Sequence, residues 1–487
     1  MRRGGGLSAE EAATTQERSG GTRLLLIVVV TAILVSVLNQ TFVNVVVPDI
    51  QQDYGVSQGQ VGWVITGYLL VFAVGIPLYG RIADLYSLRR TFAVGLAVLA
   101  LGSLFCALAP TLPLLVAGRI VQGIGASAIP ALGFAAVAKS LPPGERGTAL
   151  GLLSASVGAG AAIGPVLGGL VAGLVGWHWL FLLTVVLSAG LIPGALRALP
   201  GASKVERTGL VETLRRFDVP GGLSLALGAG FALLGVTEGQ VNGFRSPASW
   251  GSFVLFALLA VFFVWRTRTA SVPFVSPGLF RNRAFLSTAA VGFFMMFANI
   301  GSLVLSPLLL SEENGLPAAG IGLVLAPGAI VVAVLSPLAG RLSDRVGPRA
   351  LVRTGLVIML ASTFSVSAYA AGAPALWVSA GLLGLGLGFA AVNSPNANAA
   401  TATLSPEESG VGLGIYQMVF FLGGGFGPAV AATFLAFRNE AGAEALNPLY
   451  ALDAAPFSDA FLLVSAATIV AFVASFGLKS TTGKETP

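Results

Sequence analysis

A short pattern occurs twice in this chain, each time between two long apolar stretches. Gly80–Arg89 reads GRIADLYSLR, and Gly340–Arg349, 260 residues later, reads GRLSDRVGPR. A second pattern repeats with an offset of 263 residues: 145–165 and 408–428 each begin with Glu, carry Gly at the third and seventh positions and end in Gly-Pro. The repeats predict a chain built from two related halves. Two related halves of membrane helices are the architecture of a secondary transporter.

The composition indicates that the apolar stretches are membrane helices. Of the 487 residues, 55% are hydrophobic and only 10% are charged, whereas about a quarter of a typical soluble protein is charged. A helix that spans a bilayer needs about 20 mostly apolar residues. The sequence contains fourteen such segments, near residues 24–48, 59–79, 91–109, 113–138, 148–173, 178–198, 219–239, 250–267, 286–309, 317–339, 351–372, 374–402, 410–437 and 457–478.

We therefore predict an all-α polytopic membrane protein with two pseudo-symmetric six-helix bundles and two inserted helices. The repeat period is too long for six helices at roughly 30 residues each, and an inserted pair accounts for the difference. Within the connector, Pro200–Pro220 is expected to form a short amphipathic helix at the inner membrane surface. The predicted domains are a disordered cytoplasmic tail (1–22), an N-terminal six-helix bundle (23–199), a cytoplasmic connector with two inserted helices (200–268), a C-terminal six-helix bundle (269–479) and a cytoplasmic tail (480–487).

The positions of the cations predict the orientation in the membrane. The formal net charge is +6. Of the 27 Lys and Arg residues, 24 fall in segments that are predicted to lie on the same side of the membrane; the exceptions are Arg119, Arg245 and Arg438. Cytoplasmic loops carry such an excess of cations. Both termini are therefore predicted to be cytoplasmic, and the basic charge reflects topology rather than a nucleic-acid partner.

Few residues are available for metal binding or catalysis. The single cysteine, Cys106, lies in an apolar stretch, so no disulfide framework or thiolate metal site is expected. The single histidine, His178, stands between two tryptophans at the start of a predicted helix, as is typical of the membrane interface. A membrane enzyme would need a cluster of histidine, acids or nucleophiles at membrane depth. We therefore expect no cofactor, no metal and no enzymatic activity.

Three segments resemble motifs of the major facilitator superfamily. Gly80–Arg90 resembles the signature loop after the second helix, and Arg119–Ala126 (RIVQGIGA) resembles the R-x-x-Q-G-x-G-x motif. Gly160–Gly169 (GAAIGPVLGG) resembles the G-x-x-x-G-P-x-x-G-G antiporter motif. Together with fourteen predicted spans, the chain is similar to the fourteen-span drug:proton antiporters. This resemblance implies export of a small lipophilic compound from a bacterial cell, across its plasma membrane, in exchange for protons.

One stretch, Val37–Ile50, is similar to the tetracycline exporters of Gram-positive bacteria. Those exporters have Glu in three helices where this chain has Gln40, Ala161 and Gly424, and the wider family often has Asp where this chain has Asn39. The loss of these acids disfavours metal–tetracycline as the substrate. It also leaves an uncoupled facilitator or an importer of a small metabolite as alternatives to a proton-coupled exporter.

The repeated loops each contain an aspartate that is a candidate gating or coupling residue. Asp84 and Asp344 follow a Gly-Arg start in a tight inner loop. A carboxylate in that position can cap the N-terminus of a helix and pair with arginine. Rupture of this pairing would give the two-state element that alternating access requires; the alternative is a fixed structural turn. The candidate arginines are Arg81, Arg89, Arg90 and Arg341.

Two charged residues are predicted to lie within membrane helices. Arg119 is deep in the fourth helix, where burial of a cation is costly, so it should face the bundle interior and contact Gln122 or amides of the first helix. It could anchor an anionic group, support proton coupling or serve structure alone. Glu238, near the outer end of the seventh helix, is either a proton carrier or an interfacial acid.

The Gly-Pro pairs predict matched kinks in the two halves. Proline removes a helical hydrogen bond and bends the helix, and neighbouring glycines allow close helix packing. The residues concerned are Gly160, Gly164, Pro165, Gly427 and Pro428. We expect the helices that carry them to seal the transport cavity.

Uncharged polar residues are the candidate substrate contacts. Amides at lipid depth need partners, so some will bridge helices and the rest will line a cavity that suits a neutral or weakly charged amphiphile. Gln40 and Asn44 are one turn apart and can face the same ligand. The candidates are Asn39, Gln40, Asn44, Tyr68, Asn299, Asn393, Asn396 and Gln417. The expected partners are this small molecule, protons and the lipid bilayer, with the chain acting as a monomer.

Overall fold

The structure, a computed structural model, describes residues 9–56, 58–201, 217–405, 408–442 and 444–479. Within these ranges the chain forms helices and loops and no strand. The helices are α1 (Ala9–Tyr54), α2 (Gln58–Val61), α3 (Trp63–Leu85), α4 (Leu88–Ala107), α5 (Leu112–Ser140), α6 (Pro143–Val175), α7 (His178–Ala198), α9 (Val219–Asn242), α10 (Pro247–Thr269), η1 (Leu279–Arg281), α11 (Arg283–Glu312), α12 (Ala318–Val346), α13 (Pro348–Ser365), η2 (Val366–Ala370), α14 (Ala375–Ala402), α15 (Ser409–Ala441), α16 (Ala455–Ala474) and η3 (Ser475–Gly477).

The helices confirm the predicted number of membrane spans. In the described part of the chain, thirteen helices are long and apolar enough to cross a bilayer. A fourteenth is α6, whose segments Gly144–Ala161 and Val166–Val175 meet at 44°. Several helices extend beyond the predicted apolar segments, because hydropathy marks the lipid-embedded part while the helix continues into the polar interface. In particular, α1 begins at Ala9, inside the segment that the sequence predicts as a disordered tail.

Parts of three predictions lie outside the described residues. These are the amphipathic helix in the connector, where 202–216 are not described, and the tails at 1–8 and 480–487.

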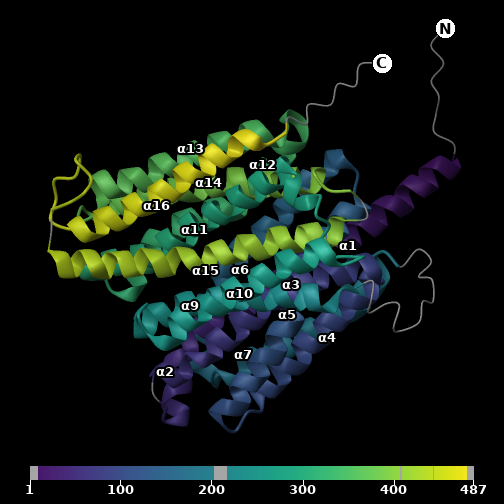
Figure 1. The fold of residues 1–487 in the computed structure, drawn as a ribbon. Coiled ribbons are helices and arrows are strands. Elements are labelled where there is room, and N and C mark those ends of the chain that lie inside the picture. Colours follow the sequence, from purple (N-terminus) through teal and green to yellow (C-terminus); the bar gives the residue numbers. More distant parts are fainter. Residues whose placement is uncertain (1–8, 57, 202–216, 406–407, 443, 480–487) are drawn as a thin grey trace.

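The helices pack as two groups with the same internal arrangement (Figure 1). In the first, called the N-terminal bundle, α1 packs on α6 and α7, and α3 and α4 pack on α5. In the second, called the C-terminal bundle, α11 packs on α15 and α16, and α12 and α13 pack on α14. The two bundles meet where α3 packs on α15 and where α6 packs on α12. The remaining pair, α9 and α10, pack on each other, and α9 also contacts α3 and α15.

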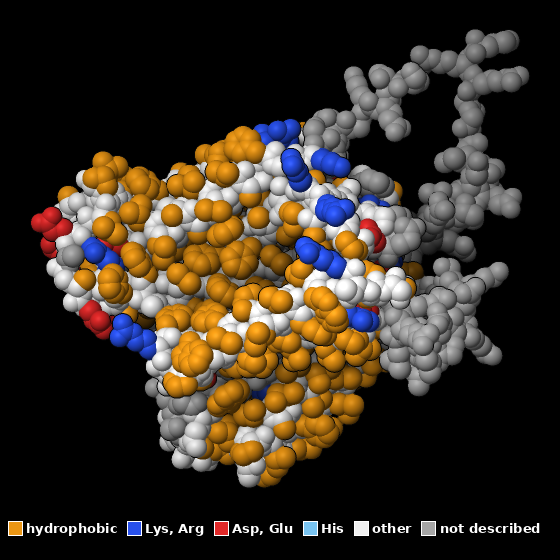
Figure 2. All heavy atoms as spheres, viewed as in Figure 1, with side chains coloured by type: hydrophobic (Ala, Val, Ile, Leu, Met, Phe, Trp, Pro, Cys, Tyr) orange, Lys and Arg blue, Asp and Glu red, His pale blue; other side chains and the backbone are white. Residues whose placement is uncertain are grey.

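Both described ends of the chain lie at the same end of the helix bundle (Figure 1). On the visible face, most Lys and Arg side chains gather toward that end, and a broad apolar surface covers the middle (Figure 2). We call it the inner end, following the sequence-based prediction that it faces the cytoplasm.

Glycines allow α5 to approach both of its neighbours. An added Cβ at Gly123 would lie 2.8 Å from the carbonyl oxygen of Tyr68 on α3. An added Cβ at Gly125 would lie 2.7 Å from the carbonyl oxygen of Gly95 on α4. These contacts are closer than carbon and oxygen tolerate, so the glycines of the RIVQGIGA motif are required by helix packing.

Substitution of Gly125 tests this packing. Gly125→Val would separate α4 from α5 and should lower the free energy of unfolding by about 1–3 kcal/mol. Thermal unfolding in detergent measures the change. The matched control is Gly190→Val on α7, where an added Cβ meets no atom within 4 Å. Equal melting temperatures for the two variants would contradict the packing argument.

Candidate functional site

Asp84 joins the two bundles at the inner end. It lies near the end of α3, and its carboxylate accepts hydrogen bonds from the backbone N–H groups of Gly410 (2.9 Å) and Val411 (2.7 Å) in the first turn of α15. The same carboxylate forms an ion pair with Lys139 of α5 at 3.0 Å. The first N–H groups of a helix have no partner within the helix, and the helix dipole favours a negative charge beside them. Asp84 is therefore an N-terminal cap supplied by the other bundle.

Asp344 forms a related contact in the opposite direction, with the fifth and sixth residues of α6. It lies near the end of α12, and its carboxylate accepts hydrogen bonds from the N–H groups of Gly147 and Thr148 in α6, both at 2.8 Å. The hydroxyl of Thr148 donates a third bond at 3.0 Å. The two repeated sequence patterns thus bind each other: the aspartate of one pattern caps the helix that begins with the other pattern.

Glycines make these caps sterically possible. An added Cβ at Gly410 would collide with the Asp84 carboxylate and with the carbonyl oxygen of Gly80. At Gly147 an added Cβ would collide with the Asp344 carboxylate and would lie 2.5 Å from the carbonyl oxygen of Gly340. Backbones therefore touch directly across the interface between the bundles, and the spacing of the glycines follows from this contact.

The four arginines that the sequence suggests as partners differ in their positions. Arg89 donates from Nε to the carbonyl oxygen of Leu199 at 2.8 Å and so ties α4 to the end of α7. Arg90 and Arg341 are exposed, whereas Arg81 is partly buried and interacts electrostatically with Asp84. The cation of the Asp84 ion pair is Lys139, which the sequence analysis did not select. The sequence places Lys139 at the inner end of an otherwise apolar helix, but its pairing with Asp84 depends on how α3 and α5 pack.

Arg119 lies at the centre of a hydrogen-bond network inside the N-terminal bundle. The side chain is 1% exposed. Its Nη1 donates to Gln122 Oε1 and to Asn39 Oδ1 (2.9 Å), and its Nε donates to the carbonyl oxygen of Val64 at 3.0 Å. The guanidinium also lies 4.1 Å from the centroid of the Tyr68 ring. All these partners are neutral, and they come from α1, α3 and α5.

This network changes the interpretation of two substrate candidates. Asn39 also donates to the hydroxyl of Thr184 on α7 at 3.2 Å, so both ends of its amide are used within the bundle. Tyr68 is fully buried beneath Arg119 and stacks on Phe72 at a centroid distance of 5.7 Å. Asn39 and Tyr68 therefore make contacts within the N-terminal bundle and do not line the cavity.

A small cavity lies between the two bundles. Its volume is about 40 Å³, far less than a drug-sized molecule needs, so the described conformation is closed around it. None of the described residues that line it is charged. The polar and aromatic ones are Ser36, Gln40, Phe72, Phe134, Ser154, Asn393, Tyr416, Gln417, Phe420 and Phe421.

Three of the predicted amides, Gln40, Asn393 and Gln417, line this cavity. Asn396 instead bridges helices, because its Nδ2 donates to the carbonyl oxygen of Thr288 (2.9 Å) and to the hydroxyl of Tyr416 (3.1 Å). The amide groups of Asn44, which is exposed, and Asn299, which is buried, are not part of the cavity lining.

Glu238 is also apart from the cavity. Its carboxylate accepts a hydrogen bond of 2.8 Å from Asn242, one turn further along α9. The side chain is partly exposed near the outer end of that helix, which agrees with the interfacial alternative.

The Gly-Pro motifs lie where α6 meets α1 and where α15 meets α11. An added Cβ at Gly160 would lie 2.9 Å from Val37, and at Gly164 it would collide with the hydroxyl of Thr41. At Gly427 it would collide with the carbonyl oxygen of Phe297. The bend in α6 coincides with Gly164–Pro165, whereas α15 passes through Pro428 as a single span, so the two kinks differ in size.

Two phenylalanines of the cavity were missed by the sequence analysis. Phe72 of α3 and Phe421 of α15 meet edge to face across the bundles, with ring centroids 5.1 Å apart. Phenylalanine is apolar and suits both a lipid-facing and a buried position of a membrane helix, so the sequence holds no signal that would select these two.

Comparisons with known proteins agree with this geometry. The family model described as Major Facilitator Superfamily matches residues 29–428. Multidrug resistance protein Stp of Mycobacterium tuberculosis is 31% identical over 401 residues, which cover 82% of this chain and 73% of that protein. Riboflavin transporter RibZ of Clostridioides difficile is 27% identical over 405 residues (83% and 86%). Lincomycin resistance protein LmrB of Listeria innocua is 27% identical over 407 residues (84% and 85%).

A solved structure shares the fold. The human organic anion transporter MFSD10 superimposes with a TM-score of 0.65 over 93% of this chain and 99% of that chain, at 17% identity.

The glycine contacts at the inner end lead to a prediction. Gly410→Val would push the Asp84 carboxylate away from the first turn of α15 and remove a cap worth about 1 kcal/mol. The amide of Val411 should therefore exchange with deuterium about fivefold faster, as measured by mass spectrometry. Gly322→Val on α12, where an added Cβ meets no atom within 4 Å, is the control. Unchanged exchange in Gly410→Val would mean that the cap does not protect this turn.

Proposed function

The chain belongs to the Major Facilitator Superfamily, and we propose that it exports a small lipophilic compound by alternating access in exchange for protons. As a member of this family it is a multi-pass membrane transporter and not an enzyme. Its bacterial relatives agree with a location in the bacterial plasma membrane. The observation that carries the proposal is the pair of reciprocal caps between the two bundles. Because one chain supplies both sides of this contact, we propose that it acts as a monomer.

The caps support a gate at the inner end. Each consists of hydrogen bonds between a carboxylate and backbone N–H groups of the other bundle. Such bonds can be replaced by water when the bundles separate, so closed and open arrangements can have similar free energies. Alternating access requires a bistable contact of this kind.

The proton is proposed to act at the Asp84 cap. Protonation would remove the negative charge that both the helix N-terminus and Lys139 stabilise. Proton binding would then favour separation of α3 from α15, and transport would be coupled to the proton gradient. Glu238 is the weaker candidate, because its contact is with Asn242 on its own helix.

The cavity supports the proposed substrate class. Its described lining combines three amides with five aromatic rings and no charge. Such a surface can pack on an apolar ring system and offer a few hydrogen bonds, which suits a neutral or weakly charged amphiphile. The relatives named for multidrug and lincomycin resistance support export.

An uncoupled facilitator or importer of a small metabolite is the second candidate. The riboflavin transporter among the relatives favours it, as does the absence of a carboxylate from the described lining of the cavity. The amides and aromatic rings could equally hold a flat heterocycle.

Everted membrane vesicles with an acidic interior distinguish the two candidates. Lincomycin, riboflavin and magnesium–tetracycline are added in turn while a fluorescent probe reports the pH gradient. A proton-coupled exporter should dissipate the gradient when its substrate is added. Asp84→Asn should abolish this response, and Asp453→Asn, at an exposed outer position, should retain it. Uptake of a radiolabelled compound with an unchanged gradient would refute proton exchange and favour the facilitator.

A cavity variant tests the substrate surface. Gln417→Ala removes one hydrogen-bonding group from the lining, which should raise KM about fivefold if one bond worth roughly 1 kcal/mol is lost. Gln240→Ala, at an exposed site on α9, is the control. Transport kinetics with the compound identified in the vesicle assay provide the measurement, and an unaltered KM would place the substrate elsewhere.

A further inference from the structure

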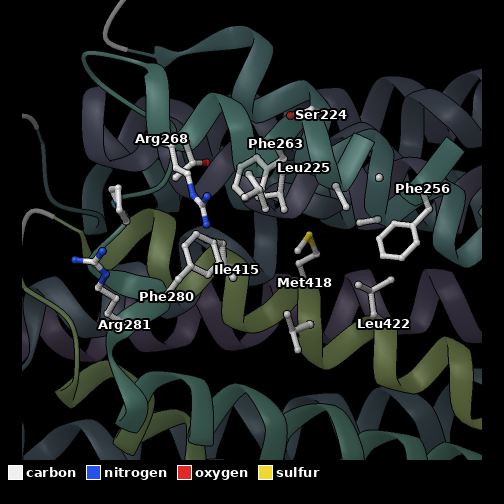
Figure 3. A pocket seen from close by; sticks show the side chains of 17 residues that line it. Ser224, Leu225, Phe256, Phe263, Arg268, Phe280, Arg281, Ile415, Met418 and Leu422 are labelled. Atoms are coloured by element: carbon white, nitrogen blue, oxygen red, sulfur yellow. The ribbon is translucent and has the colours of Figure 1, made fainter. Parts of the chain in front are cut away.

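A second and larger cavity shares no lining residue with the cavity between the bundles. It is a crevice of about 640 Å³ that runs over α9 between α10 and α15 (Figure 3). Its walls are almost entirely apolar and include Leu225 of α9, Phe256 and Phe263 of α10, and Met418 and Leu422 of α15. The crevice therefore offers a long apolar surface beside the inserted helix pair.

The crevice opens toward the lipid. α10 packs on α9 and leaves part of its surface uncovered, and its crevice residues Phe256 and Val264 are 40% and 48% exposed. The polar group of Ser224 in the lining is already used, because its hydroxyl donates to the carbonyl oxygen of Gly221 at 2.9 Å. An apolar chain could enter from the bilayer without burying an unpaired polar group.

Two arginines lie at one end of the crevice. Arg268 is in the last turn of α10, and Arg281 is in η1; Figure 3 shows both at the same end, beside Phe280. Both are exposed. Among the described residues, no acidic side chain lines the crevice. This end therefore attracts an anion, while the rest of the crevice accepts only apolar groups.

The backbone around the arginines is held by a buried contact. Asp218, at the start of α9, is 2% exposed and accepts hydrogen bonds from Arg266 Nε (2.8 Å) and from the N–H of Phe274 (2.9 Å). This contact joins the start of α9 to the end of α10 and to the segment that leads to η1. Arg266 is thereby neutralised, whereas Arg268 points toward the crevice (Figure 3).

We propose that this crevice is a binding site for an anionic phospholipid. The phosphate group would lie between Arg268 and Arg281, and an acyl chain would extend over Leu225 and Met418. Both arginines are at the inner end, and the cytoplasmic leaflet carries anionic lipids that attract basic side chains. A neutral substrate could pack on the apolar walls but would leave the two arginines without an anion. A lipid of phosphatidylglycerol type offers both an acyl chain for the walls and a phosphate for the arginines.

Lipid binding to the purified full-length protein tests this proposal without any transport measurement. Native mass spectrometry compares phosphatidylglycerol with phosphatidylcholine of identical acyl chains. Phosphatidylglycerol should bind more tightly, and Arg268→Gln and Arg281→Gln should each weaken it about fivefold. Arg197→Gln, at the exposed inner end of α7, should bind as the wild type does.

A second pair of variants tests the apolar part. Ala260→Phe places a ring in the crevice and should reduce phosphatidylglycerol binding, whereas Val261→Phe, on the exposed side of the same helix, should not. Equal binding of the two lipids, or wild-type binding in the Arg268→Gln/Arg281→Gln double variant, would overturn the proposal. Displacement of bound lipid by lincomycin or riboflavin would identify the crevice as a substrate site and would overturn it too.

Discussion

Two carboxylates that cap helices of the opposite bundle set the arrangement of the whole molecule. Asp84 binds the first turn of α15, and Asp344 binds the N–H groups of Gly147 and Thr148 near the start of α6. The N–H groups of Gly410 and Val411 need such an acceptor, because the first N–H groups of a helix have none within their own helix. A carboxylate can reach them only if the backbones touch, which requires glycine at Gly147 and Gly410. The duplicated sequence patterns thus correspond to two related contacts between the bundles.

Other strong polar contacts lie within one bundle and serve a different purpose. Arg119 is buried among neutral partners of the N-terminal bundle. In the C-terminal bundle, Arg438 and Asp459 form a buried ion pair at 2.6 Å that ties α15 to α16. Breaking either contact would leave a buried charge without its partners, at a cost of several kcal/mol. These contacts favour movement of each bundle as a unit, whereas in the proposed mechanism water replaces the caps between the bundles. Rigid bodies joined by exchangeable contacts are what a rocking transporter needs.

Some features could be predicted from sequence because they depend on charge or on repetition. The membrane spans, the two-bundle plan and the contact between Arg119 and Gln122 follow from apolar length, duplicated loops and the cost of a buried cation. The roles of the amides could not be separated: Gln40 lines the cavity while Asn39, its neighbour, binds Arg119. An amide satisfied by another helix and one facing a ligand have the same sequence signal. The choice of Lys139 as the partner of Asp84 depended on how α3 and α5 pack, which no local pattern encodes.

The distance between the bundles at the inner end tests the central claim most directly. Spin labels at Arg197 of α7 and Ala350 of α13, both exposed, would be introduced in a Cys106→Ser background. In the Asp84→Asn/Asp344→Asn double variant, loss of two caps worth about 1 kcal/mol each should shift the ratio of short to long distances by about 30-fold. Asp453→Asn should keep the wild-type distribution. An unchanged distribution in the double variant would mean that the two carboxylates do not hold the inner end closed.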